Sequence, residues 1–255
     1  MLFSSWLRKK AQKPTPPTRF RPRLEALDDR LVPSTLTVTN NLDTGFTGDG
    51  SLRGEIAAAQ SGDTIVFAGG VSGTIVLNSD GNAAGGFELY LDKNLDIEGP
   101  GCKKLSISGA GSRVFDVAAG AHVTLSGLTI EKGSGTAGGF DPSVDDGEGG
   151  GILNFGTLTV NDCIVKNNHV AAGMPELALG GGIYNAGTLT LSHTTVTGNF
   201  GAGYGGGIYN DATGILAVSN HSSVTKNTVT ISGADLYNLG TWSIDSTSKV
   251  GKVGP

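Results

Sequence analysis

The chain has 255 residues, of which 42 are glycine, more than twice the usual share of about 7%. It has no apolar run of about 18 residues and no glycine at every third position, so the sequence excludes a transmembrane helix and a collagen helix. Residues 1–34 hold eight bases and three acids, a balance of +5, so the overall charge of −5 leaves −10 on residues 35–255. An acidic body of this kind repels phosphate, and no nucleic-acid partner is expected.

Residues 1–34 form a leader whose composition differs from that of the rest of the chain. The stretch KKAQKPTPPTRFRPR (9–23) is basic and rich in proline, which predicts an extended, disordered arm. Its one apolar piece, around Leu2 and Leu7, precedes the charges, whereas a conventional secretory leader has its apolar segment after them. The string FRPRLEALDDRLVPS (20–34) resembles the N-terminal segment of predicted surface and secreted proteins of planctomycete bacteria. The resemblance implies export; a solvated tail is the alternative.

From residue 35 onward the sequence predicts many short strands. Apolar and polar residues alternate, which is typical of strands with one buried face. One segment, 51–60, predicts a helix instead, with Ser51 as N-cap and with Leu52, Ile56 and Ala59 on one face. The expected strands before residue 131 are 36–39, 63–67, 73–77, 89–91, 95–97, 105–107, 114–117, 123–125 and 128–130.

The second half of the chain is an internal repeat. Its copies are GGGILNFGTLTVNDCIVKNN (149–168), GGGIYNAGTLTLSHTTVTGN (180–199), GGGIYNDATGILAVSNHSSVTKN (205–227) and the diverged GADLYNLGTWSIDSTSKV (233–250). A repeat of this length with about three short strands predicts one coil of a parallel β-solenoid, because a single coil cannot bury its apolar face alone. Hairpins of an antiparallel sandwich are the alternative, but they do not require near-identical copies.

Stacking of the copies predicts columns of equivalent residues along the solenoid. Asparagines recur at the same place in every copy, where they are expected to bond to one another along the axis. Together these features predict an all-β, single-stranded parallel β-helix of about eight coils over residues 35–255, with segment 51–60 as an N-terminal capping helix. The expected columns are Asn154, Asn185, Asn210 and Asn238; Ile152, Ile183, Ile208 and Leu236; Leu158, Leu189 and Leu216; and Val160, Leu191 and Val218.

A family resemblance covers roughly residues 36–250. The order SLRGEIAAAQSGDTIVF (51–67), LSISGAGSRVFDVAAG (105–120), VTLSGLTIEKG (123–133) and then the GGGI repeats resembles right-handed parallel β-helix repeat proteins of the pectin-lyase-like superfamily. The repeats are also similar to those of polymorphic outer-membrane adhesins, although valine stands at 165, 196 and 224 in place of the adhesins' aromatic residue. The resemblance implies a right-handed helix that is either an adhesin-like surface protein or a polysaccharide lyase or glycoside hydrolase.

The sequence offers few candidates for lyase or hydrolase chemistry. A lyase commonly uses arginine or calcium to neutralise a uronic carboxylate. Arg113 is the one arginine after Arg53, and we expect it at a coil edge or facing solvent without a catalytic role. A hydrolase needs two carboxyl groups at a fixed separation. The densest acidic patch is a loop that lacks EF-hand spacing, so we expect a solvated insertion, with a weak calcium site as the alternative; its acids are Asp141, Asp145, Asp146 and Glu148.

Histidines and tyrosines recur at equivalent positions of successive copies. His193 and His221 follow Asp162 of the preceding copy, but no nucleophile elbow accompanies Ser192, Thr194 or Ser222, so a solvent-facing histidine ladder is expected. His122 and His169 have no apparent partner in the sequence. Tyr184, Tyr209 and Tyr237 can stack beside the asparagine column, where they either pack under loops or form a sugar-binding strip.

These observations predict a non-catalytic, exported protein of the cell surface, outer membrane or extracellular space. The expected partner is a cell-surface glycan, a polysaccharide or a protein, and no catalytic, metal or cofactor site is expected. Cys102 and Cys163 are too few for a disulfide framework and are expected not to pair. A carbohydrate-active enzyme of the pectin-lyase-like type is the alternative function, and a module of a longer adhesin is a third.

Overall fold

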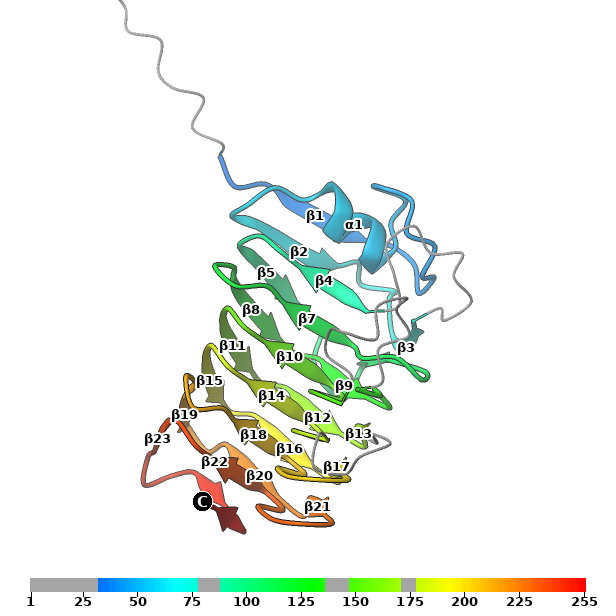
Figure 1. Ribbon diagram of the computed structural model, residues 1–255. Coiled ribbons are helices and arrows are strands. Elements are labelled where there is room, and N and C mark those ends of the chain that lie inside the picture. The colour runs from blue at the N-terminus through cyan, green and yellow to red at the C-terminus, as the bar shows by residue number, and fades with distance from the viewer. Residues whose placement is uncertain (1–31, 78–87, 136–146, 171–177) are drawn as a thin grey trace, which may run out of the picture. The chain divides into compact units, whose positions relative to one another are not determined.

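The computed structural model describes residues 32–77, 88–135, 147–170 and 178–255. Contacts divide the chain into two units, residues 1–32 and 33–255, and the fold described is that of the second. This unit is a parallel β-solenoid whose described residues contain one helix (Figure 1). The predicted solenoid and the predicted low helix content are therefore confirmed, while residues 1–31 of the predicted leader lie outside the described residues.

Three long parallel sheets, here named A, B and C, run the length of the solenoid, and a short sheet joins β13, β17 and β21. Sheet A is formed by β1 (Thr35–Val38), β2 (Asp63–Phe67), β5 (Leu95–Glu98), β8 (His122–Ser126), β11 (Thr157–Asn161), β15 (Thr188–Ser192), β19 (Ile215–Ser219) and β23 (Thr241–Ile244). Sheet B is formed by β3 (Gly73–Val76), β6 (Leu105–Ser108), β9 (Thr129–Glu131), β12 (Ile164–Lys166), β16 (Thr195–Thr197), β20 (Ser223–Thr225) and β24 (Lys249–Val250). Sheet C is formed by β4 (Leu89–Leu91), β7 (Phe115–Val117), β10 (Ile152–Asn154), β14 (Ile183–Asn185), β18 (Ile208–Asn210), β22 (Leu236–Asn238) and β25 (Val253–Gly254), and the short sheet by β13 (His169–Val170), β17 (Phe200–Gly201) and β21 (Thr228–Val229).

The solenoid has fewer complete turns than the sequence predicts. From β2 the described chain returns to sheet A at β5, β8, β11, β15, β19 and β23, which makes about six turns rather than eight. The difference arises at the two ends. β1 is followed by a helix and then directly by β2, so it begins no turn of its own, and β23 to β25 start a last turn that does not return to sheet A.

The predicted apolar columns form the core. Ile183 pairs with Ile152 on one side and with Ile208 on the other, and all three side chains are fully buried. The two columns of sheet A also have the predicted register, and they continue into Trp242 and Ile244 of β23. Because each coil buries its apolar side chains against its neighbours, the stability of a coil depends on the coils beside it.

The predicted helix is α1 (Leu52–Ala58), and it closes the N-terminal end of the core. The Ser51 hydroxyl accepts the Gly54 amide at 3.0 Å, which confirms the predicted N-cap. Leu52 and Ile56 are buried in the core cluster. At the other end of the helix, the Lys93 ammonium donates to the carbonyl oxygens of Ile56 and Ala59 at 3.2 and 3.0 Å, satisfying carbonyls that a helix C-terminus leaves unpaired.

Two asparagine ladders run along the solenoid, and the sequence predicted one of them. In the predicted ladder each amide nitrogen donates to the next amide oxygen, from Asn154 to Asn185, Asn210 and Asn238, at 2.7, 2.7 and 2.8 Å. The second ladder lies between sheets B and C. It joins Asn168, Asn199, Asn227 and the carboxylate of Asp235, at 3.0, 2.9 and 3.0 Å.

The second ladder explains the triple glycines of the repeat. Gly180 has a φ of +71°, a left-handed conformation that favours glycine. A Cβ on Gly182 would lie 2.6 Å from the Gly207 carbonyl oxygen and 3.0 Å from the Asn199 side-chain carbon, so the backbone approaches the ladder too closely for any side chain. The GGGI motif and the final Asn of the first three copies are thus two parts of one packing arrangement.

Candidate functional site

The outer face of sheet A carries a regular array of small polar side chains. Adjacent strands lie about 4.8 Å apart, so residues in register form straight rows across the turns. The first row consists of Thr64, Asp96, Thr124, Thr159, Thr190, Ala217 and Ser243. A second row runs beside it, from His122 through Thr157 to Thr188.

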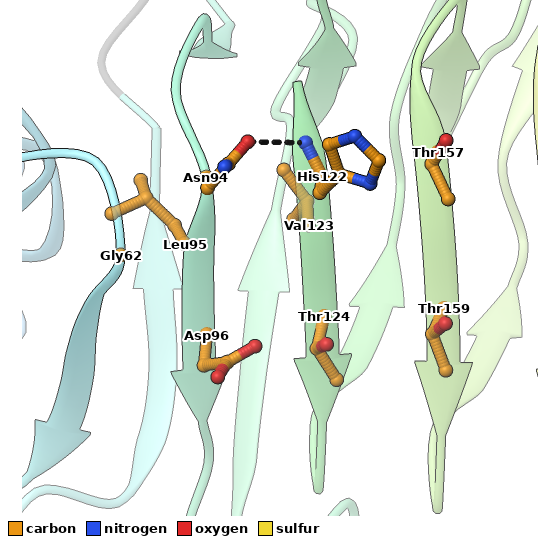
Figure 2. Close-up of a pocket in the computed structure, with 9 residues that line it drawn as sticks. All are labelled: Gly62, Asn94, Leu95, Asp96, His122, Val123, Thr124, Thr157 and Thr159. Atoms are coloured by element: carbon orange, nitrogen blue, oxygen red, sulfur yellow. Dashed lines mark hydrogen bonds between the residues drawn. The ribbon is translucent and has the colours of Figure 1, made fainter. Parts of the chain in front are cut away.

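A hollow of about 310 Å³ lies on this face over β5, β8 and β11. Figure 2 shows Asp96, Thr124 and Thr159 side by side in one row, with His122 and Thr157 in the row above. The backbone amide of His122 donates to the Asn94 side-chain oxygen at 2.9 Å, which ties two turns together at the rim. The remaining lining residues are Gly62, Leu95 and Val123.

The chemistry of this sheet A hollow suits a hydroxyl-rich ligand. Threonine hydroxyls donate and accept hydrogen bonds, the Asp96 carboxylate accepts them, and the exposed His122 imidazole can do either. Its lining contains one carboxylate and neither lysine nor arginine. The lining therefore offers no cation to neutralise a uronic acid. Glu98, a second carboxylate, lies outside the lining but on the same exposed face of β5.

Sequence reasoning missed this hollow because it treated His122 as a residue without partners. The signal was present in the strand segments themselves. Aligning LDI (95–97) with VTL (123–125) by their inward residues puts Asp96 beside Thr124, as the structure does. It also puts Asn94 beside His122, as Figure 2 shows. The missing step was to read the outward residues of successive strands as a surface.

Arg113 is buried, so the expectation that it faces solvent is wrong, whereas its place between β6 of sheet B and β7 of sheet C is that of a coil-edge residue. Its side chain is 2% exposed and lies 3.5 Å from the carboxylate of Glu88. Its guanidinium also donates to the carbonyl oxygens of Gly149 and Glu148, at 3.1 and 2.9 Å. A buried arginine needs these partners, and a guanidinium held in this way connects three segments of the chain.

The acidic loop of the sequence analysis falls mainly outside the described residues. Asp141, Asp145 and Asp146 are outside the described residues. Glu148 is described, and its backbone carbonyl oxygen accepts a hydrogen bond from Arg113. Within the described ranges, no group of three or more His, Cys, Asp or Glu side chains is placed to hold a metal ion. The calcium alternative stays a prediction.

The two equivalent histidines stack, and of the hydroxyls named with them only that of Ser192 lies within hydrogen-bond distance of an imidazole, 3.2 Å from His193 Nδ1. The rings of His193 and His221 are 6.2 Å apart and nearly parallel, and both residues are exposed, which confirms the solvent-facing ladder. The buried hydroxyl of Thr194 donates to the Val160 carbonyl oxygen at 2.9 Å, and that of Ser222 donates to the Ser219 carbonyl oxygen at 2.6 Å. Both hydroxyls are engaged by backbone, away from the imidazoles.

The tyrosine column packs under other residues rather than forming an open strip. Tyr209 stacks on Tyr184 at 5.4 Å and on Tyr237 at 5.3 Å. Tyr184 and Tyr209 are buried in a second apolar cluster with Leu153, against which Tyr204 packs. Burial, followed by the nearby charge of Asp211, raises the pKa of Tyr209 to about 12.

The remaining reactive groups are the two cysteines, and both are free thiols. Cys163 is buried in the core cluster, and this burial raises its pKa to about 12. Cys102 is half-buried. The described part of the chain also contains no helix long and apolar enough to cross a membrane.

Comparison of the chain with protein-family models, with curated proteins and with solved structures gives no match. The polar face of sheet A and the placement of the charged residues around it are therefore the structural features that bear on function.

Proposed function

We propose that this protein is a non-catalytic β-solenoid that binds a glycan on the outer face of sheet A. The observation that carries this proposal is the hollow in which hydroxyl groups of Thr124 and Thr159 lie in register beside Asp96, with Thr157 in the neighbouring row. Their backbone belongs to paired strands, so the groups are held in position before a ligand arrives. A rigid binding face loses little conformational entropy on binding, which favours recognition of a flexible polysaccharide.

The exported and surface-associated part of the proposal rests on the leader and on the family resemblance. The resemblance to planctomycete surface proteins covers residues 20–34, and the ordered motifs of residues 36–250 resemble the pectin-lyase-like superfamily and the adhesin repeats. Membership of that superfamily, an adhesin-like role and an extracellular or outer-membrane location are parts of the same proposal. An acidic, glycine- and threonine-rich solenoid with a glycan-binding face fits such a role.

The placement of charged groups supports a binding protein over a lyase. Arg113 is buried against backbone carbonyls, and the other arginine of the body, Arg53, forms a 2.7 Å ion pair with Asp43 that is also buried. Neither guanidinium is placed to neutralise a uronic carboxylate in the sheet A hollow. The carboxylate of Asp96 would instead repel an anionic sugar there.

A glycoside hydrolase is the second candidate, and one observation favours it. Asp96 and Glu98 lie two residues apart on the same face of β5, where the strand rise separates their Cα atoms by about 7 Å; inverting glycosidases hold their two carboxyl groups about 6.5–9.5 Å apart. However, both side chains are exposed. A catalytic acid usually has a carboxyl group shielded from water, which supports binding without hydrolysis.

The test is a glycan screen combined with depolymerase assays on the whole chain. We expect binding to at least one neutral polysaccharide, and a loss of about three- to tenfold in affinity for Thr124→Val and Thr159→Val, which remove hydroxyls but keep side-chain shape. Thr197→Val on the outer face of sheet B is the matched control and should bind normally. Absence of binding to every glycan refutes the proposal. Sugar release that Asp96→Asn or Glu98→Gln abolishes would establish the hydrolase instead.

A further inference from the structure

A second hollow, of about 240 Å³, lies between α1 and β4, on a different face from the sheet A hollow. Its walls combine apolar side chains of the helix, Ile56 and Ala57, with Leu89 and Tyr90 of β4. Asp92, Lys93 and Arg53 complete the lining. Sites for drug-sized ligands usually measure about 300–1,000 Å³, so this smaller hollow fits a single ring.

Tyr90 is the exposed member of the outer column of sheet C. It pairs with Asp116 of β7, which pairs in turn with Leu153 of β10. Further along the column the side chains of Leu153, Tyr184 and Tyr209 are buried in their own cluster, whereas Tyr90 is 51% exposed. An aromatic ring that is half open to solvent and lines a hollow can accept the flat apolar face of another ring.

The Asp92 carboxylate near Tyr90 is open to a ligand, whereas the two cationic side chains of the lining are already bound to other groups of the protein. Burial raises the pKa of Tyr90, and the nearby carboxylates of Asp116 and Asp92 raise it further, so its phenol stays protonated at neutral pH. The Lys93 ammonium donates to carbonyls of the α1 C-terminus, and the Arg53 guanidinium is paired with Asp43 and donates to the Glu88 carbonyl oxygen. The exposed carboxylate of Asp92 thus lies beside the ring as a hydrogen-bond acceptor, while Lys93 and Arg53 bind groups of the protein.

We propose that this hollow is a second glycan-binding site, in which a neutral pyranose ring stacks on Tyr90. The apolar C–H face of the sugar lies on the phenol ring, and sugar hydroxyls donate to the Asp92 carboxylate. The apolar wall of Ile56, Ala57 and Leu89 covers the edge of the ring. The proposal draws on the proposed function for the class of ligand, but it concerns different residues on a different face. Two sites on one rigid solenoid would let one polysaccharide bind with avidity.

The test measures binding of cellotetraose, N-acetylchitotetraose and trigalacturonate to the whole chain by calorimetry and saturation-transfer NMR. We expect a neutral tetrasaccharide to bind, and trigalacturonate to bind at least tenfold more weakly because Asp92 and Asp116 repel it. Tyr90→Ala should weaken binding of the neutral tetrasaccharide about three- to tenfold, the loss expected for one ring stack. Tyr90→Phe keeps the ring and should remain within about twofold of the parent. Phe200→Ala, at a similarly exposed aromatic residue of the short sheet, is the matched control and should have no effect.

The two sites can fail separately. If Thr159→Val weakens binding and Tyr90→Ala does not, the second site is refuted and the proposed function stands. If Tyr90→Ala weakens binding and Thr159→Val does not, the Tyr90 site stands and the sheet A site is refuted. If neither neutral tetrasaccharide binds the parent chain, the Tyr90 site is refuted, and the glycan screen decides the sheet A site. Tyr90→Ala is expected to keep the parent's far-UV circular dichroism and melting temperature because the side chain is half exposed. Tyr90→Phe keeps the ring and the fold, so normal binding by this variant shows that stacking, and not the hydroxyl group, is what Tyr90→Ala removes.

Discussion

Replacing Asn185 by alanine tests whether the buried hydrogen bonds of the asparagine ladder stabilise the solenoid. Asn185 is fully buried and accepts from the Asn154 amide at 2.7 Å. Its own amide nitrogen donates to the Asn210 side-chain oxygen at 2.7 Å and to the carbonyl oxygens of Gly187 and Ile215, at 3.2 and 3.3 Å. Alanine removes all four bonds at once.

The expected cost follows from which groups lose their partners. A buried polar group left unsatisfied costs about 1–3 kcal/mol, and Asn185→Ala leaves the Asn210 side-chain oxygen in that state, whereas the Gly187 carbonyl oxygen keeps the Ile215 amide at 2.8 Å. Some of the groups that lose Asn185 as a partner keep a second hydrogen bond, as the Asn154 amide does with the Thr188 carbonyl oxygen at 3.2 Å. We therefore expect a loss of about 1–3 kcal/mol in the free energy of unfolding.

Asn238 provides the matched control because it is the same residue at the end of the same ladder. It accepts from Asn210 at 2.8 Å and donates to the Gly240 carbonyl oxygen at 3.0 Å, and it is half-buried, so water can replace its bonds. Asn238→Ala should cost about 1 kcal/mol or less.

Urea unfolding of both variants, followed by circular dichroism, measures the difference through the midpoint and the slope of each transition. Costs that agree within about 0.5 kcal/mol would refute the reasoning, because they would show that burial within the stack does not matter.

Three further predictions concern the core, the pH dependence of stability and the thiols. Ile183→Asp places an unpaired carboxylate between Ile152 and Ile208 and should cost several kcal/mol; a melting temperature within a degree or two of the parent's would contradict the register. The backbone amides of Gln60 and Ser34 hold the pKa of Asp63 below its usual value, so the unfolded chain binds more protons in acid and the contribution of Asp63 is lost as the pH falls through its folded-state pKa. The stability deficit of Asp63→Asn in urea should accordingly be full above about pH 5 and shrink below it; a deficit that does not change with pH would exclude this role. The thiol of Cys163, with a pKa of about 12, should react with Ellman's reagent at pH 8 after unfolding only; modification of both cysteines in the native protein would contradict its burial.

The repeat was enough to predict the solenoid and the register of its second half. Near-identical copies specify which residues stack, and Ile152, Ile183, Ile208 and the predicted asparagines lie in that register. The helix was also readable, because Ser51 and the alanine-rich segment after it are local signals. These features depend on residue type and spacing alone, which a sequence states directly.

Predicting which polar residues share a surface requires an alignment of coils that differ in length. The chain distance between stacked residues of sheet A is 32 from Asp63 to Leu95 but 28 from Leu95 to Val123, so Asp96, His122 and Thr159 show no fixed period. The second asparagine ladder was missed for a related reason. Its last member is Asp235, eight residues after Asn227 in the chain and directly beside it in space.

The burial of charged and aromatic residues was decided by the tertiary structure. Arg113 looks like a surface residue in the sequence, yet the carbonyls of Gly149 and Glu148, some 35 residues further on, hold its guanidinium inside. Tyr90 and Tyr184 both alternate with inward apolar residues, and a strand pattern states only that both face outward. Which of them meets solvent depends on what packs over each strand, and that is set by segments distant in the sequence. The amino-acid sequence thus determined the coil and its first asparagine ladder, whereas the three-dimensional packing of the coils determined which side chains remain available to a ligand.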